Sequence, residues 1–264
     1  MSMTKIASWN VNSIRARLDA VLPWIQEHQP DVLAIQETKV ENSQFPAAAF
    51  EELGYYVTFH GQKSYNGVAT ISKSPLENVC TSWPGEHNDT ECRLLAGTFN
   101  GTRIINVYVP NGQDVTSEKY TYKLEWLKRF RDFAADELQH YSEMILLGDF
   151  NIAPQDEDVY DPKVWQGCVL VSEPERHALQ RLFHLGFQDS FRLFDHPKEQ
   201  YSWWDYRAAA FRRNMGLRID LILVSSSLAK RCIQSEIDKS PRGKEKPSDH
   251  TPVWINYKPL VNDE

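Results

Sequence analysis

The sequence lacks the features that mark membrane, secreted and zinc-binding proteins. No apolar run approaches the roughly 20 residues that cross a bilayer, and the first segment, "MSMTKIASWN", contains no secretory leader. The four cysteines form no CxxC pair and have no histidine close by in the sequence, which argues against a zinc site and a disulfide framework. We therefore expect reduced thiols in a cytoplasmic protein that does not bind membranes.

Linkers and repeats are missing as well. No stretch rich in Gly, Ser or Pro divides the 264 residues, and no repeat of solenoid period is present. A composition of 41% hydrophobic and 25% charged residues is that of a globular protein rather than a disordered or coiled-coil chain. We expect one domain over residues 1–264 and, by default, a monomer.

The net charge of −7 argues at first against a polyanionic substrate, but positive charge is concentrated in one region. Residues 201–250 contain ten Lys and Arg against six acids, a local charge of +4 that leaves −11 for the remainder. This distribution is compatible with a basic face on an acidic body, and equally with an ordinary solvated surface.

Short apolar runs of strand type recur along the whole chain and predict more than one sheet. They cover residues 5–11, 32–36, 55–59, 67–72, 93–99, 103–109, 144–148, 218–224 and 253–257. Helical spacing of apolar residues predicts one helix from Ser117 to Leu138, capped by Thr116 or Ser117. A second helix is expected from about Glu173 to Leu185.

The order of these elements favours an α/β fold with sheets packed face to face and helices outside. A doubly wound parallel sheet is the alternative. It is disfavoured because the four runs between residues 55 and 109 follow one another through loops too short for crossover helices.

Acidic and amide side chains stand at the ends of several of these strands. Asp149 and Asn151 close the run "ILLGDFN", and their spacing in an extended segment predicts that both face one site. Others in comparable positions are Asn10, Glu37, Asp220, Asp249 and His250.

Each of these residues also has an ordinary structural interpretation. Asn10, Asn151 and Asp249 taken singly are typical turn or capping residues, and a lone His250 is typical of a structural histidine. Asp220, however, lies in the strand run "RIDLILV", where a buried carboxylate needs hydrogen bonds or a cation. If the set converges, its mainly oxygen ligands predict Mg²⁺ or Mn²⁺ rather than zinc.

Nine segments, in this order, resemble the exonuclease III family of DNA-repair nucleases, within the endonuclease/exonuclease/phosphatase superfamily. The matching segments run from residue 7 to residue 254: "ASWNVNSIRAR", "PDVLAIQETK", "YNGVATISK", "NVYVPNG", "YKLEWL", "ILLGDFNIAPQDEDVYDP", "YSWWDYR", "GLRIDLILVS" and "KPSDHTPVW". The extension "APQDEDVYDP" and Leu217, where animal members have tryptophan, are similar to the bacterial type.

The resemblance implies a four-layered α/β sandwich like that of deoxyribonuclease I, with two mainly antiparallel sheets flanked by helices. It also implies a Mg²⁺-dependent phosphodiesterase that cuts duplex DNA 5′ to abasic sites and removes nucleotides or blocking groups from 3′ ends. Mn²⁺ could substitute for Mg²⁺.

The resemblance also implies roles for individual residues. Glu37 would be the main metal ligand, with Asn10 and Asp249 nearby and Asp149 and Asn151 available for a second ion. Asp149 would deprotonate the attacking water, and His250, oriented by Asp220, would bind the ion or a phosphate oxygen. Tyr108 and Asn111 would contact the scissile phosphate, and either Tyr108 or a water on the ion would protonate the leaving oxygen.

The segment from Tyr201 to Arg218 combines aromatic and basic side chains and is expected to contact DNA. Its candidate contacts are Trp203, Trp204, Arg207, Phe211, Arg212 and Leu217. Core packing is an equal alternative for Trp204. Rival functions are a phosphatase or deadenylase of the same superfamily, and a protein that binds damaged DNA without cutting it.

Overall fold

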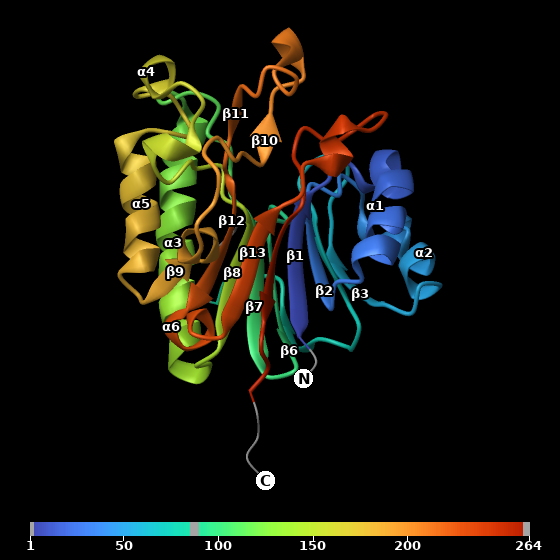
Figure 1. Cartoon of the computed structure of the whole chain (residues 1–264). Helices are drawn as coiled ribbons and strands as arrows, with labels where there is room; N and C mark the ends of the chain where they lie inside the picture. The colour runs from blue at the N-terminus through green and yellow to red at the C-terminus, as the bar shows by residue number, and fades with distance from the viewer. Residues whose placement is uncertain (1–2, 85–89, 261–264) are drawn as a thin grey trace.

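Two six-stranded sheets pack face to face, with helices on the outer side of each (Figure 1). The structure is a computed structural model and describes residues 3–84 and 90–260. None of the helices in these ranges combines the length and the apolar character that a bilayer crossing needs. The expected sandwich of mainly antiparallel sheets is confirmed, and the doubly wound alternative is wrong.

The first sheet has the strand order β13-β14-β1-β2-β4-β3. In it only β1 and β2 are parallel, and the other neighbours pair antiparallel. Its strands are β1 (Thr4–Asn10), β2 (Val32–Gln36), β3 (Tyr56–His60), β4 (Val68–Ser72), β13 (Cys232–Ile237) and β14 (Val253–Tyr257).

The second sheet has the order β5-β6-β7-β8-β12-β9, and β7 and β8 form its one parallel pair. Its strands are β5 (Glu77–Cys80), β6 (Leu94–Phe99), β7 (Thr102–Tyr108), β8 (Met144–Asp149), β9 (Phe187–Asp189) and β12 (Asp220–Ser225). A separate two-stranded pair, β10 (Trp203–Trp204) and β11 (Gly216–Leu217), rises above the sheets (Figure 1).

Each parallel pair is joined by a crossover helix, as parallel strands require. Helix α1 (Ile14–His28) links β1 to β2, and α3 (Glu118–His140) links β7 to β8. The serine expected to cap α3, Ser117, accepts a hydrogen bond from the Tyr120 backbone N–H. The other helices are α2 (Ala47–Glu51), α4 (Pro162–Trp165), α5 (Glu173–Phe183) and α6 (Ser226–Ala229).

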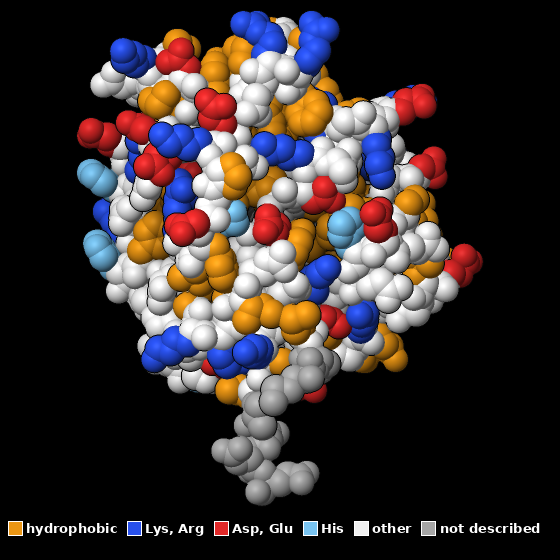
Figure 2. Space-filling view, in the orientation of Figure 1, with side chains coloured by type: hydrophobic (Ala, Val, Ile, Leu, Met, Phe, Trp, Pro, Cys, Tyr) orange, Lys and Arg blue, Asp and Glu red, His pale blue; other side chains and the backbone are white. Residues whose placement is uncertain are grey.

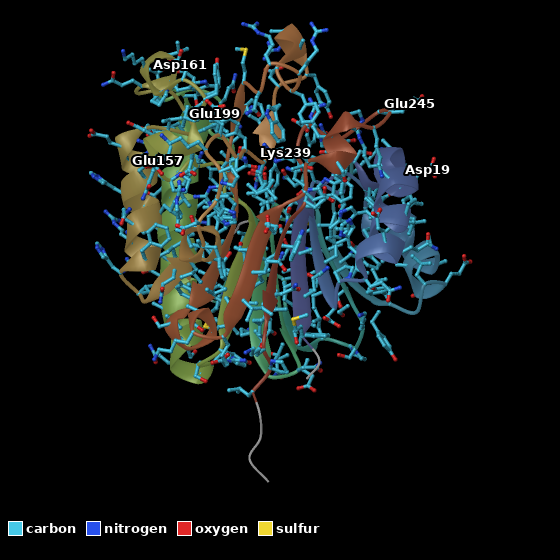
Figure 3. The ribbon with its side chains drawn as sticks, viewed as in Figure 1. Asp19, Glu157, Asp161, Glu199, Lys239 and Glu245 are labelled. Carbon is cyan, nitrogen blue, oxygen red and sulfur yellow. The ribbon has the colours of Figure 1, made fainter. Side chains whose placement is uncertain are left out.

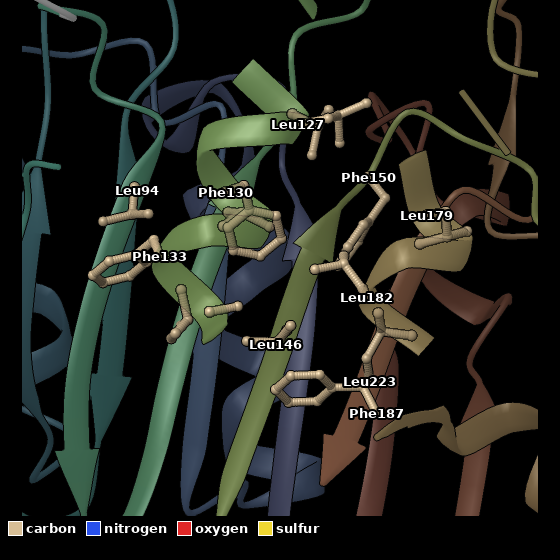
Figure 4. Packing of buried hydrophobic residues seen from close by; sticks show 14 of the residues in the cluster. Leu94, Leu127, Phe130, Phe133, Leu146, Phe150, Leu179, Leu182, Phe187 and Leu223 are labelled. Atoms are coloured by element: carbon tan, nitrogen blue, oxygen red, sulfur yellow. The ribbon is translucent and has the colours of Figure 1, made fainter. Parts of the chain in front are cut away.

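The alternation of side chains along the strands builds three apolar layers. In β8, Ile145 and Leu147 face the other sheet, while Met144 and Leu146 face helices α3 and α5. Figure 4 shows this outer layer, in which Phe130 of α3 and Leu179 of α5 lie over the second sheet. Helix α1 covers the first sheet in the same way. Both sheets are thus buried on two faces, which leaves their strand ends as the place for polar side chains.

Candidate active site

The candidate site lies where the carboxyl ends of the two parallel pairs meet. Asn10 ends β1, Glu37 follows β2, Tyr108 ends β7 and Asp149 ends β8. The two crossover connections thus deliver four strand ends to one edge, at the upper end in Figure 1. The antiparallel strand β12 adds its first residue, Asp220, directly opposite Asp149.

A glycine allows β8 to reach this edge. Gly148 has a φ of +141°, and a Cβ atom there would lie 1.9 Å from the carbonyl oxygen of Val107 on β7. Only glycine fits so close to the neighbouring strand without moving it. The residue before the catalytic candidate Asp149 therefore fixes how that carboxylate is presented.

Asn10 joins the two central carboxylates. Its Nδ2 donates to Glu37 Oε1 at 2.8 Å and to Asp149 Oδ2 at 2.9 Å, although the three residues are far apart in the sequence. Asn10 and Asp149 are buried and Glu37 is half-buried, with a φ of 51° that is unusual for glutamate. The convergence expected for Asn10, Glu37 and Asp149 is present.

His250 lies between two aspartates. Its Nδ1 is 2.8 Å from Asp220 Oδ2, and its Nε2 is 3.6 Å from Asp149 Oδ2. All three side chains are buried. The pairing of Asp220 with His250, which the family resemblance implied, is therefore present in this chain, although Asp220 begins β12 rather than lying inside a strand.

Asn151 reaches the same centre by a different backbone path from the one expected. Its φ is 50°, in the left-handed region, so the prediction that the segment from Asp149 to Asn151 is extended was wrong. The side chain of Asn151 nevertheless faces the same site as Asp149, as expected. Asn151 Nδ2 donates to Asp149 Oδ2 at 3.3 Å and to the Val109 carbonyl at 2.9 Å. Asn111, in the loop after β7, donates its Nδ2 to Asn151 Oδ1 at 3.1 Å.

Asp249 is held at the rim of the site. It accepts hydrogen bonds from Asn12 Nδ2 at 2.9 Å and from Trp203 Nε1 at 3.0 Å. Burial would raise the pKa of this carboxyl, but the charge on His250 and these two donors lower it below the ordinary value. The predicted ligand Asp249 therefore stays ionised.

The central groups have unusual proton affinities. Burial, together with the nearby carboxylates of Asp220 and Glu37, raises the pKa of Asp149 to about 7, against the opposing effect of His250 and Asn10. Burial alone would lower the pKa of His250, but Asp220 and Asp149 outweigh it and raise the value to about 10. At neutral pH the imidazole therefore carries a proton on both nitrogens.

Tyr108 is a neutral phenol in this setting. Burial is the largest cause, and the charges of Glu37 and Asp149 add to it, so the pKa of Tyr108 lies well above 10. Its hydroxyl forms a hydrogen bond with Glu37, and the Arg93 guanidinium lies 4.7 Å from the centre of its ring. The hydroxyl therefore keeps its proton at neutral pH and is available as a hydrogen-bond donor.

The donor set suits a hard divalent cation. Among the described residues, Glu37, Asp149 and His250 form a group whose ligand atoms lie within 4.8 Å of one another. Burial is the largest cause of the raised pKa of Asp149, and a cation beside this carboxylate would stabilise its ionised form. Two carboxylates with amide oxygens nearby favour an oxygen-preferring ion over zinc.

Lys39 is a residue of the site that was not predicted from the sequence. Its ammonium lies 2.9 Å from Glu37 Oε2 and also donates to Asn12 Oδ1, so it partly neutralises the predicted metal ligand. The available signal was its place two residues after Glu37 in "QETK", in a segment where the backbone turns.

The residues expected to contact DNA separate into two groups. Arg207 and Arg212 are exposed and Phe211 is half-buried, on the segment between β10 and β11 at the tip of the molecule. Trp203 is half-buried beside Asp249. Trp204 and Leu217, by contrast, are 0% exposed, so neither presents surface to a substrate here, because both pack beneath this tip.

The charge around this end is mixed. Figure 2 shows Lys and Arg side chains at the tip above β10 and β11, and acidic side chains on the shoulders. Figure 3 labels several of the rim residues: Glu157, Asp161, Glu199, Lys239 and Glu245. Two of the basic residues in 201–250 are structural: Arg218 is buried against Asp158 and Asp189, and Arg242 is buried and donates to the Trp204 carbonyl.

Comparison with known proteins supplies the family. Residues 7–250 match the Endonuclease/Exonuclease/phosphatase family. The chain is 36% identical to exodeoxyribonuclease III of Haemophilus influenzae over 96% of this chain and 100% of that protein.

Two solved structures are similar over nearly the whole chain. One is a 3′ phosphatase from Neisseria bound to a product DNA hairpin, with a TM-score of 0.95 and 41% identity, covering 97% of this chain and 99% of that one. The other is an AP endonuclease from Archaeoglobus fulgidus, with a TM-score of 0.93 and 41% identity, covering 97% and 100%. The chain therefore belongs to the endonuclease/exonuclease/phosphatase family.

Proposed function

We propose that this chain is a Mg²⁺-dependent DNA-repair nuclease that cuts duplex DNA 5′ to abasic sites and removes nucleotides or blocking groups from 3′ ends. The observation that carries the proposal is the group of half-buried Glu37 and buried Asp149 and His250 at the meeting point of the strand ends. The names of the relatives, an exodeoxyribonuclease III, a 3′ phosphatase and an AP endonuclease, support the same class of reaction.

Asp149 is the best-placed general base. A carboxylate whose pKa is about 7 can accept a proton from water at neutral pH more readily than an ordinary one. The Nδ2 of Asn151 lies beside it and cannot ionise, so it would orient the attacking water or donate to the phosphate. The pair thus explains why a carboxylate and a carboxamide stand two residues apart after β8.

His250 and Tyr108 would act on the phosphate and the leaving group. The protonated imidazole, held at Nδ1 by Asp220, has its Nε2–H available to donate to a phosphate oxygen. The Tyr108 hydroxyl retains its proton at neutral pH and can transfer it to the leaving 3′ oxygen. Asn111 would donate to a further phosphate oxygen.

The carboxylates of Glu37 and Asp149, with Asn10, Asn151 and Asp249 around them, would hold Mg²⁺, or Mn²⁺ in its place. When bound, the ion would neutralise the charge that develops on the phosphate oxygens.

DNA would approach the end that carries the β10–β11 segment. Arg207 and Arg212 would contact phosphates, and Trp203 and Phe211 would contact a sugar that lacks its base. We also propose that the protein is a monomer and that it acts in the cytoplasm.

The test is an incision assay with four substrates: a duplex with an abasic site, a duplex with a recessed 3′ end, a duplex with a 3′-phosphate, and an inositol phosphate. Each is incubated with and without Mg²⁺, with Glu37→Gln as the control for contaminating nuclease. Mg²⁺-dependent cleavage of the DNA substrates by the wild-type protein alone supports the proposal. Binding without cleavage would indicate a damage-recognition protein, and activity on inositol phosphate alone would indicate a phosphatase.

A further inference from the structure

A fully buried ion pair lies directly behind the candidate site. Lys123 of α3 and Glu175 of α5 are both 0% exposed, and the Lys123 ammonium donates to Glu175 Oε1. Lysine and glutamate are rarely buried to this degree, and removing either one alone leaves an uncompensated charge. Packing two helices does not require such a pair, since apolar residues of similar volume would serve.

The other two contacts of Lys123 point into the site. Its Nζ donates to the backbone carbonyl of Asn151 at 2.6 Å and to that of Asn111 at 3.1 Å. An ammonium has three N–H donors, so Glu175 and these two carbonyls account for all of them. The side chains of Asn111 and Asn151 are themselves hydrogen-bonded to each other. One cation therefore fixes the backbone of both carboxamides that are expected to face the phosphate.

Glu175 anchors this arrangement to rigid structure. It accepts from the backbone N–H of Leu170 at 3.0 Å and of Ser172 at 3.1 Å, and from the Ser172 hydroxyl at 2.5 Å. The Ser172 hydroxyl is in turn 2.6 Å from the hydroxyl of Tyr120 on α3. Glu175 thus holds the Lys123 ammonium in place from α5. The ammonium in turn donates hydrogen bonds to the segments that follow β7 and β8.

The backbone at Asn151 needs such support. With a φ of 50°, this residue is in the left-handed region, and its peptide carbonyl is buried away from water. Without a donor, the peptide can rotate to satisfy that carbonyl elsewhere, which would carry the side chain away from Asp149.

We infer that Lys123 is a positioning residue for the reaction: through the carbonyls of Asn111 and Asn151 it holds their carboxamides in the geometry that the scissile phosphate requires. The inference rests on the proposed nuclease function and assigns Lys123 no contact with DNA.

The test compares two double variants that each remove a buried ion pair from α3. Lys123→Met/Glu175→Gln removes both charges together, which avoids leaving a lone buried one. The matched control is Arg103→Met/Glu137→Gln, a pair between β7 and α3 that lies near the opposite end of the helix, with side chains 3% and 13% exposed. Melting temperature, DNA affinity without Mg²⁺, and kcat and KM on the substrate that the wild-type protein cuts are measured for both.

We expect kcat of the Lys123 variant to fall by about 10- to 100-fold, with KM and DNA affinity within about twofold of wild type. The control variant is expected to lose comparable thermal stability and keep its kcat. The side-chain amide signals of Asn111 and Asn151 in a ¹⁵N NMR spectrum should shift only in the Lys123 variant. If the Met variant does not fold, Lys123→Gln/Glu175→Gln, which keeps amide donors, replaces it.

An unchanged kcat in the folded Lys123 variant, or an equal loss in the control, would overturn the inference. If the wild-type protein cuts no DNA, it is the proposed function that fails. The two amide signals then decide separately whether Lys123 holds Asn111 and Asn151, since they require no reaction.

Discussion

Asp149 and Asp220 are directly opposite each other in the antiparallel pair of β8 and β12, and the imidazole of His250 contacts both carboxylates. Two acids so close together in a buried place would repel each other, and the shared imidazolium offsets that repulsion. The charge on His250 therefore compensates both carboxylates at the centre of the site.

The charge on His250 should depend on Asp220. The folded-state pKa of about 10 exceeds the ordinary value of 6.5, so protonated His250 stabilises the fold fully below 6.5. That contribution is lost as the pH rises through about 10. In metal-free protein, Asp220→Asn should lower the pKa of His250 in an NMR titration, and its stability deficit relative to wild type should shrink as the pH rises over this range.

The control for this titration is Asp238→Asn. Asp238 Oδ2 lies 3.4 Å from His28 Nε2, so this is another aspartate–histidine pair, between the last turn of α1 and the residue after β13. Its removal should leave the titration of His250 unchanged. A His250 that titrates near 6.5 in the wild-type protein would contradict the arrangement.

Asp149→Asn should separate binding from chemistry. The amide retains the shape of the carboxylate but cannot accept the proton of the attacking water, so we expect the incision rate to fall by about 10²- to 10⁴-fold. DNA affinity, measured by fluorescence anisotropy, should be kept or increased because one negative charge near the phosphate is gone. Asp156→Asn, which changes an exposed carboxylate in the following loop, is the control. Incision near the wild-type rate would refute the role of Asp149 as base.

Divalent ions should stabilise the protein through Glu37. At an ion concentration about 100-fold above Kd, binding to the folded state adds about 2.7 kcal/mol to the free energy of unfolding. We expect the melting temperature of the wild-type protein to rise with Mg²⁺ or Mn²⁺ and to return on adding EDTA. Glu37→Gln should abolish the rise and Glu41→Gln should preserve it. An equal rise in Glu37→Gln would place the ion elsewhere.

Gly148→Ala should be destabilising for a local steric reason. The added Cβ would lie 1.9 Å from the Val107 carbonyl oxygen, which is backbone and cannot move aside cheaply. We expect a loss of more than about 2 kcal/mol in urea unfolding, together with reduced incision because Asp149 shifts. At Gly101, which has a φ of +80° and open space around its Cβ position, the same change should cost about 1 kcal/mol. Equal costs at both positions would show that β7 and β8 can separate.

Much of the architecture was predictable because its strands are buried on both faces and so appear as continuous apolar runs. All nine predicted strands are present, including β8 and β12, which bring Asp149 and Asp220 together. The strands that were missed, β5, β9, β10, β11 and β13, are short or polar. The missed helix α1 contains Pro23, which interrupts the helical pattern.

The site was predictable as a set of residues, whereas of its contacts only the pairing of Asp220 with His250 was expected, from the family resemblance. Asn10, Glu37, Asp149 and His250 could be selected by type and place, since polar residues at the ends of apolar runs need a shared explanation. The buried Lys123 had one available signal, its place on the apolar face of a predicted helix, three residues after Tyr120 and four before Leu127. Its partners could not be read from the sequence, because they come from two loops and another helix.

The pairing of the first and last strands of the first sheet has a practical consequence. Thr4 of β1 lies opposite Tyr257 of β14, at the lower end of the sandwich in Figure 1. Asn10, at the other end of β1, lies in the candidate active site. A fluorophore or surface tether attached beside Thr4 or Tyr257 would therefore lie a strand length away from the edge that is proposed to bind DNA. Immobilised protein should keep its activity, which suits single-molecule measurement of the incision step.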